Sequence, residues 1–547
     1  MSSRKQHRLT RRQLLAYAGL SGLGLTLAAC QQQVVEKIVK ETVEVPKVVE
    51  REVEKLITPT PVAYKKGGSL VFGIPGDIKT LDPHVSQLMV WSFIRWQVFD
   101  RLLSMDEKGV PQPSLATGYR WVDATTLELS LRDDVTFHNG AKFTADDVKH
   151  TADRIMKPDL PTEFRARLAS LDSVQVIDAT HVRMRLKEPD ATFPALLCQL
   201  DIISKSVPED QLSTTPVGTG AFKLVDWKPN EAIRLERNDA YYLADLPYLD
   251  SIVFKPIPDV EGRISSLMTG DVDVCMEVPA KDVARLATAE GVEVVVTESG
   301  WLYIMYVNLA KPPLNDKRIR QALLYGFDRK GFVRDFMAGL SKVTNTPIAP
   351  QSWAHNPDVE ALYGYDPEKA KELLAQAGFP EGKGLVLEYI YPVGLEEFKS
   401  VGEYMQANLA DIGVTLKVTG LELAAWSNKI AKEKTYELSL DFRDSGQGDP
   451  ALQFNDHTFF RPDKDNLDGF TEDMIPGYLD LIKQGKAETD QAKRKDIYQK
   501  LQKLWAEELP GLIVTRSNGI VATRSWVKGY EITPTRYPYL SLAWLDK

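Results

Sequence analysis

The side chains that could carry catalysis are spread along this chain without the spacings that catalytic motifs require. The seven histidines include no His-Glu-x-x-His or His-x-x-x-His pair that could hold a catalytic metal. There is no Cys-x-x-Cys pair, and no Gly-x-Ser-x-Gly elbow that would expose a nucleophilic serine. Residues 378–384 begin like a phosphate-binding loop, but their glycines have the wrong spacing. Residues 463–469 begin like a calcium-binding loop, but a leucine occupies a ligand position and the glycine comes too late. We therefore expect no enzyme activity, no metal and no cofactor.

One cysteine near the N-terminus lies in a setting that predicts lipidation. Residues 4–12 carry five basic side chains and no acidic one, and residues 14–29 form a short apolar run interrupted by glycines. Such a run is typical of an export signal rather than a membrane span. The small residues before Cys30 resemble a bacterial lipobox, in which the cysteine thiol is acylated, and the pair Arg11-Arg12 resembles a twin-arginine signal. An ordinary signal peptide with a chance cysteine is the alternative.

The composition is that of an acidic globular protein. The formal net charge is −9, and cleavage before Cys30 would remove five positive charges and leave −14. A surface this acidic argues against nucleic-acid binding. The 547 residues are too many for a single core, so we expect two or more domains. We expect Cys198 and Cys275 to be two separate buried thiols, although an exported protein permits a disulfide.

The hydrophobic patterns predict a mixture of strands and helices after an extended N-terminal segment. Valine, charge and proline in residues 30–66 favour a solvated tether over a coiled stalk. Alternation predicts strands at 127–131 and 182–186. Thr144 and Asp366 have the sequence context of helix N-caps. This mixture indicates an α/β or α+β fold without identifying which one.

Five ordered blocks of sequence carry a family resemblance. Together they resemble the corresponding stretches of the family 5 extracellular solute-binding proteins of ABC importers, the group of oligopeptide- and dipeptide-binding receptors. The resemblance extends from about residue 67 to the C-terminus. The blocks are Leu81-Asp82-Pro83-His84, residues 131–148, residues 216–224 (Pro-Val-Gly-Thr-Gly-Ala-Phe-Lys-Leu), residues 308–329 and residues 365–378.

The resemblance implies an α/β clamp of the periplasmic-binding-protein type II, with two lobes, hinge strands and an extra subdomain in the first lobe. Ligand would fill the cleft and favour lobe closure by a hinge motion. A membrane permease with its ATPases would then recognise the closed, monomeric receptor. The expected units are a signal peptide at 1–29, a lipid-anchored tether at 30–66, lobe one at 67–300 with its subdomain at about 101–211, lobe two at 301–515, and a return to lobe one at 516–547.

Two segments hold the candidate ligand residues. Trp301 and Tyr303 point to one face of a predicted strand, at the place where the chain first passes from lobe one into lobe two. There they either border the ligand or belong to the core. In peptide-binding members, an aspartate shortly after a later strand pairs with the peptide's α-amino group, and Asp444 matches that position. A carboxylate facing an ammonium group makes a charge-assisted hydrogen bond that fixes the register of the peptide.

The second segment departs from the family pattern. The aromatic residues that commonly precede the Asp-Pro pair are replaced here by residues 445–448, which begin with Ser445. Arg443 could also neutralise Asp444, so a structural Arg–Asp pair remains open. We include Arg443 and Ser445 among the candidates, and the aromatic side chains expected to line the cleft are Trp91, Tyr391 and Trp426.

The sequence therefore predicts an extracytoplasmic receptor, lipid-anchored to the bacterial cell membrane, that delivers peptides to an ABC importer. Some family members bind oligosaccharides, and aromatic side chains can stack on sugar rings, so an oligosaccharide is the alternative ligand. A lipid-anchored enzyme on the same clamp, and a sensor that presents the closed clamp to a membrane kinase, are alternatives of other classes.

Overall fold

One ten-stranded mixed sheet runs through the whole molecule. The computed structural model describes residues 64–86, 89–162, 164–444, 448–455, 467–532 and 538–547. In spatial order, the strands of this sheet are β14 (Thr415–Leu421), β13 (Val386–Pro392), β15 (Leu438–Asp444), β12 (Val292–Val307), β16 (Gly511–Arg524), β11 (Val274–Cys275), β1 (Ser69–Ile74), β10 (Ser251–Pro256), β9 (Ala232–Arg237) and β8 (Phe222–Lys228).

The two longest strands, β12 and β16, belong to both lobes. The first half of β12 pairs with the second half of β16 beside β11, and the second half of β12 pairs with the first half of β16 and with β15. Their antiparallel register shifts between Glu298 and Leu302. The strands that join the lobes are therefore continuous, with an irregularity between the two halves.

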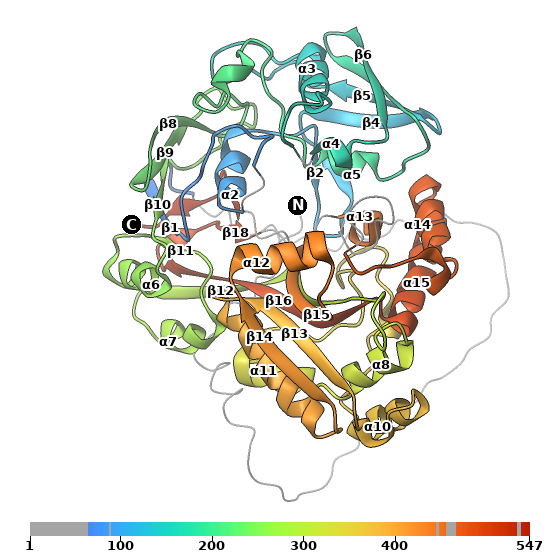
Figure 1. Ribbon diagram of the computed structural model, residues 1–547. Coiled ribbons are helices and arrows are strands. Elements are labelled where there is room, and N and C mark those ends of the chain that lie inside the picture. The colour runs from blue at the N-terminus through green and yellow to red at the C-terminus, as the bar shows by residue number, and fades with distance from the viewer. Residues whose placement is uncertain (1–63, 87–88, 163, 445–447, 456–466, 533–537) are drawn as a thin grey trace, which may run out of the picture.

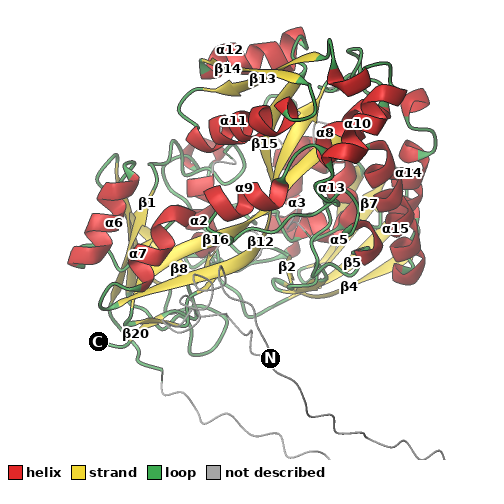
Figure 2. Ribbon diagram, turned by 90° about the horizontal axis from the view of Figure 1, so that it is seen from below, coloured by secondary structure: helices red, strands yellow, loops and turns green. Residues whose placement is uncertain are grey.

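Helices cover both faces of the sheet (Figure 1). The face that carries the candidate site is covered by α6 (Val260–Thr269) and α7 (Val283–Ala287) in the first lobe, and by α9 (Arg329–Phe336) and α11 (Glu396–Ala410) in the second. Figure 2 shows α7 and α9 alongside β12 and β16. The opposite face carries α12 (Leu423–Asn428). The second lobe is completed by α8 (Lys317–Tyr325), α10 (Pro367–Gln376), α13 (Pro450–Asn455), α14 (Tyr478–Ala487) and α15 (Gln491–Glu508).

A separate antiparallel sheet forms the extra subdomain of the first lobe. Its strand order is β4 (Ala116–Asp123), β5 (Thr126–Leu131), β7 (His181–Leu186) and β6 (Leu171–Asp178), with α3 (Ala145–Ile155) packed against β6. The subdomain is completed by the hairpin of β2 (Leu103–Met105) and β3 (Pro111–Pro113), with α4 (Phe164–Arg167) and α5 (Phe193–Leu197).

Two helix starts lie where the sequence predicts them. The backbone N–H of Thr144 donates to the carboxylate of Asp147 at 2.9 Å, and α3 begins at the next residue. The carboxylate of Asp366 accepts from the backbone N–H of Lys369 at 2.9 Å, and α10 begins at Pro367. The N-cap predictions for both helices are confirmed.

The Gly-Thr-Gly turn at 218–220 packs against the end of α2 (Met89–Val98) and the residues that follow it. A Cβ atom on Gly218 would lie 1.9 Å from the carbonyl oxygen of Val98, so no larger residue fits there without a backbone shift. The Thr219 hydroxyl donates to Asp100 at 3.1 Å. These contacts give the block a structural role.

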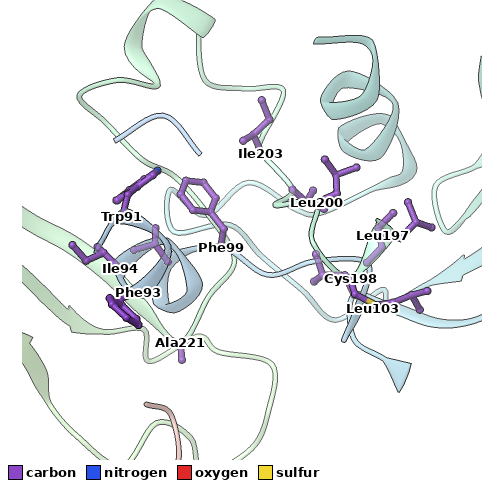
Figure 3. Packing of buried hydrophobic residues seen from close by; sticks show 14 of the residues in the cluster. Trp91, Phe93, Ile94, Phe99, Leu103, Leu197, Cys198, Leu200, Ile203 and Ala221 are labelled. Atoms are coloured by element: carbon purple, nitrogen blue, oxygen red, sulfur yellow. The ribbon is translucent and has the colours of Figure 1, made fainter. Parts of the chain in front are cut away.

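Trp91 is a core residue of the first lobe. Its side chain is 1% exposed, and its indole N–H donates to the carbonyl oxygen of Asp82 at 3.1 Å. Figure 3 shows it on α2 among buried neighbours that include Ile94 and Phe99. This position does not fit the expectation that Trp91 lines the cleft, because the side chain is enclosed by other core residues.

Within the parts of the chain that the structure describes, no helix combines the length and the apolar character needed to cross a membrane.

Candidate ligand-binding site

A cleft of about 520 Å³ lies against the hinge strands. The first lobe contributes residues 277–281, which follow β11, together with Ser517, Asn518 and Ile520 of β16. The second lobe contributes Trp301 and Tyr303 of β12, Phe442 of β15, and side chains of α9 and α11. Both lobes build the walls, and the volume is typical of a small-molecule site. A change in the angle between the lobes would therefore change the shape of this cleft.

Three aromatic side chains form one wall of the cleft. Tyr303 and Phe442 are register partners on β12 and β15, and their rings pack edge to face with centroids 4.8 Å apart. Trp301 lies two residues before Tyr303, and the centroid of its ring is 6.4 Å from the centroid of the Phe442 ring. Alternate residues of a strand share a face, and so do paired residues of neighbouring strands. The strand register therefore brings these three aromatic side chains together on one face of the sheet. Trp301 and Tyr303 therefore lie together, on one face, as their spacing predicts.

The cleft is acidic. Glu396 and Glu397 lie in the first turn of α11, and the Tyr303 hydroxyl donates to Glu397 Oε2 at 2.6 Å. Glu277 enters from the first lobe, and its backbone has φ of 55°, in the left-handed region that non-glycine residues rarely adopt. Among the described residues of the lining, Lys281 is the one with a positive charge.

Asp444 is the last residue of β15, and its register partner is Trp301. The register therefore places its Cα beside the aromatic wall. The side chains of Arg443 and Asp444, and the whole of Ser445, lie outside the described part of the structure. The expected roles of these three residues remain predictions.

The comparisons with known proteins agree with this architecture. The sequence profile described as bacterial extracellular solute-binding proteins, family 5, middle region, matches residues 110–464, well over half of the chain. The chain belongs to family 5 of the bacterial extracellular solute-binding proteins. It is a binding protein of the extracytoplasmic compartment rather than an enzyme.

Individual relatives are similar over most of their length. The chain is 28% identical over 482 residues to heme-binding protein A of Haemophilus influenzae, covering 81% of this chain and 85% of that protein. It is 28% identical over 473 residues to the probable di/tripeptide-binding protein 5 of Pseudomonas aeruginosa, covering 80% of this chain and 88% of that protein.

A solved structure has the same fold. The oligopeptide-binding protein AppA of Bacillus subtilis, determined in complex with a nonapeptide, superposes with a TM-score of 0.74 at 25% identity. The match covers 88% of this chain and 100% of that chain. The likeness confirms the predicted two-lobed clamp with hinge strands and an extra antiparallel subdomain.

Two predicted aromatic residues of this solute-binding protein lie away from the cleft wall. Tyr391 is half-buried and stacks on Tyr389 with ring centroids 6.3 Å apart. Trp426 is half-buried on α12, and its indole N–H donates to the hydroxyl of Ser439 at 2.9 Å. Ser439 and Phe442 are three residues apart on β15, so Trp426 and the aromatic wall lie on opposite faces of the sheet.

Several residues that line the cleft were not predicted from the sequence. Phe442 could have been found, because it precedes Asp444 by two positions on a strand and so shares its face. Glu277 carries no local sequence signal, since its left-handed backbone appears only in the fold. Glu396 and Glu397 read as an ordinary acidic first turn of a helix.

Proposed function

We propose that this solute-binding protein captures a peptide by closing its lobes and delivers it to the permease of an ABC importer. The observation that carries the proposal is the cleft, which both lobes build against continuous hinge strands. Ligand that contacts both walls stabilises the closed arrangement, and only this differential affinity can drive closure. The similarity to a di/tripeptide-binding protein and to a receptor solved with a nonapeptide supports a peptide as the solute.

Asp444 is the proposed anchor for the α-amino group of the peptide. Its register partner Trp301 belongs to the cleft wall, so an ammonium group held at the end of β15 leaves the rest of the ligand against aromatic side chains. Arg443 and Ser445 flank the anchor. Trp301 and Tyr303 border the ligand in this proposal, and Trp426 and Tyr391 support the sheet that carries them.

We also propose the molecular context of the receptor. Export by the signal at 1–29, acylation of Cys30 and the tether at 30–66 anchor the clamp to the outer surface of the cell membrane. Lobe one then comprises 67–300, with its subdomain at about 101–211, together with 516–547, and lobe two comprises 301–515. A tether of this length spans up to about 120 Å when extended, which leaves the clamp free to reach a permease.

Native mass spectrometry tests the ligand class. The chain without its predicted signal is purified under native conditions, and whatever dissociates from it is identified. A set of peptide masses supports the proposal. Masses spaced by a hexose contradict the peptide assignment and favour an oligosaccharide, for which the aromatic wall of Trp301, Tyr303 and Phe442 offers stacking surfaces.

A further inference from the structure

The extra subdomain of the first lobe touches the second lobe through residues that do not belong to the hinge strands. Figures 1 and 2 both show α5 of the subdomain beside α13 of the second lobe. The backbone N–H of Ala191, just before α5, donates to the carbonyl oxygen of Lys486 on α14 at 2.7 Å. The backbone N–H of Trp353 donates to the carbonyl oxygen of Lys108 at 3.4 Å. Two backbone hydrogen bonds therefore join the lobes outside β12 and β16.

An apolar side chain of the second lobe is buried against the first lobe. Leu452 belongs to α13, yet it is 7% exposed and lies in the hydrophobic cluster that forms the core of the first lobe. Leu452 and Leu196 of α5 line the same small cavity between the lobes. Separation of the lobes would expose Leu452 to water, so its burial favours the closed arrangement.

A carboxylate of the subdomain is already oriented toward the second lobe. Asp190 is 2% exposed, and its carboxylate accepts hydrogen bonds from the hydroxyl groups of Ser170 and Thr192, each at 2.6 Å. The ammonium nitrogen of Lys486 lies 3.4 Å from the same carboxylate. Because the hydroxyl groups hold Asp190 in place, this ion pair orders fewer side chains than a pair between two mobile residues. It is a second contribution to closure.

Two glycines allow the lobes to approach closely. Gly109 lies in the turn between β2 and β3 of the subdomain, and Gly448 lies just before α13. A Cβ atom on Gly109 would lie 2.4 Å from the carbonyl oxygen of Gly448, and a Cβ atom on Gly448 would lie 2.5 Å from the end of the Met105 side chain. Larger residues at either position would hold the two surfaces apart. The surfaces of the two lobes are therefore matched in shape at this contact.

We propose that the contacts of Leu452 and Lys486 with the subdomain form a latch, which holds the clamp closed without help from the solute. A hinge motion that separates the lobes breaks these contacts, and closure forms them again. The proposal rests on the proposed function, because it takes closure of the lobes as the motion that captures the solute. The latch sets the closed fraction of the empty receptor, and through that fraction it adjusts the affinity for every solute.

Hydrogen exchange of the Ala191 amide tests the latch. The experiment uses protein that native mass spectrometry shows to be free of solute, and fragmentation in the mass spectrometer resolves single amides. We expect the Ala191 amide to exchange at least about tenfold more slowly than in an unstructured peptide, because its bond to Lys486 must open first. It should still exchange faster than the amides of β12, which belong to the core of the sheet.

Either of two rates for Ala191 in the wild-type protein would overturn the proposal. Exchange as fast as in an unstructured peptide would mean that the lobes do not stay closed without solute. Exchange as slow as in β12 would mean that the contact opens only when the whole protein unfolds, so that it is a permanent joint rather than a latch.

Two variants weaken the latch and keep the hydrogen bond that reports on it. Leu452→Ala removes apolar surface buried between the lobes, and Lys486→Ala removes the ammonium group but keeps the carbonyl oxygen that Ala191 uses. Each should speed exchange of the Ala191 amide at least about threefold. Unchanged exchange of this amide in both variants would overturn the proposal.

The controls are one amide and one lysine of the same helix. The amide of Leu481 donates to the carbonyl oxygen of Gly477 at the start of α14, and its exchange rate should be the same in all variants. Lys483→Ala, at an exposed position of α14, should leave the rates of both amides unchanged.

The outcome of this test does not depend on peptide capture, because no solute is present. Native mass spectrometry that finds no peptide contradicts the proposed function and leaves the exchange rates as they are. A receptor that retains peptides but shows no protection at Ala191 keeps the proposed function and loses the latch, so that the solute and the hinge strands alone control closure.

Discussion

Asp449 and Arg494 form a buried two-point ion pair that joins the start of α13 to α15. The two guanidinium nitrogens lie 2.8 Å from the two carboxylate oxygens, and both residues are nearly inaccessible to solvent. The guanidinium also lies over the rings of Trp353 and Tyr498, at 5.3 and 5.4 Å. Asp449 is thus fixed against α15, a helix that lies more than 40 positions further along the chain.

Removing the carboxylate of this pair should destabilise the protein strongly. In Asp449→Asn, Arg494 keeps its charge in a buried site without its counter-ion, and we expect the free energy of unfolding to fall by about 3–5 kcal/mol. Urea denaturation followed by tryptophan fluorescence measures it. Asp496→Asn on the exposed side of α15 is the control and should change little. An unchanged unfolding midpoint in Asp449→Asn would contradict the role assigned to the pair.

Replacing the proposed anchor should affect only ligands with a free amine. We expect Asp444→Asn to weaken binding of a peptide with a free N-terminus by roughly ten- to a hundredfold, because a charge-assisted hydrogen bond is lost. The N-acetylated form of the same peptide should bind both proteins equally weakly. Calorimetry on the four combinations isolates the interaction. Equal weakening for both peptides would place Asp444 in a structural role instead.

The local features of this fold can be predicted from the sequence, but its long-range geometry cannot. Thr144 and Asp366 start helices as predicted, because the capping groups lie within three residues of the N–H groups that they serve. Trp301 and Tyr303 share a face because strand alternation is also local. The partnership of Trp301 with Asp444 joins residues 143 positions apart, so no local pattern reveals it. For the same reason, Glu277 and Glu397 cannot be assigned to one cleft before the lobes are assembled.

The two cysteines of the globular part should be unreactive in the native protein. Both thiols are free and buried, and the Cys198 thiol contacts the carbonyl oxygens of Ser104 and Pro194 at 3.3 and 3.4 Å. Burial raises the pKa of both, to about 11 for Cys275, and the reactive thiolate is therefore scarce. With Cys30→Ala to remove the third thiol, Ellman's reagent should report no thiol in the native protein and two after denaturation. Two thiols detected only after reduction would indicate a disulfide.

The imidazole of His138 should make stability depend on pH. Its Nε2–H donates to the carbonyl oxygen of Gly220 at 3.0 Å, and its Nδ1 accepts from the backbone N–H of Gly218 at 3.4 Å. The ring must be neutral to accept that hydrogen bond, and burial lowers its pKa from 6.5 to about 4. In the unfolded chain the same ring binds a proton below about pH 6.5. The unfolded state therefore binds more protons between pH 6.5 and 4, so stability falls as the pH is lowered through that window.

This dependence can be isolated with His138→Gln, whose side chain does not titrate. The glutamine variant should be less stable than the wild type at pH 7.5, because the ring bridges the turn at 218–220. As the pH is lowered from 6.5 toward 4, the stability gap between the two proteins should narrow by up to about 1.4 kcal/mol per pH unit, since only the wild type carries this titrating group. A gap that stays constant across this range would show that His138 titrates alike in the folded and unfolded states.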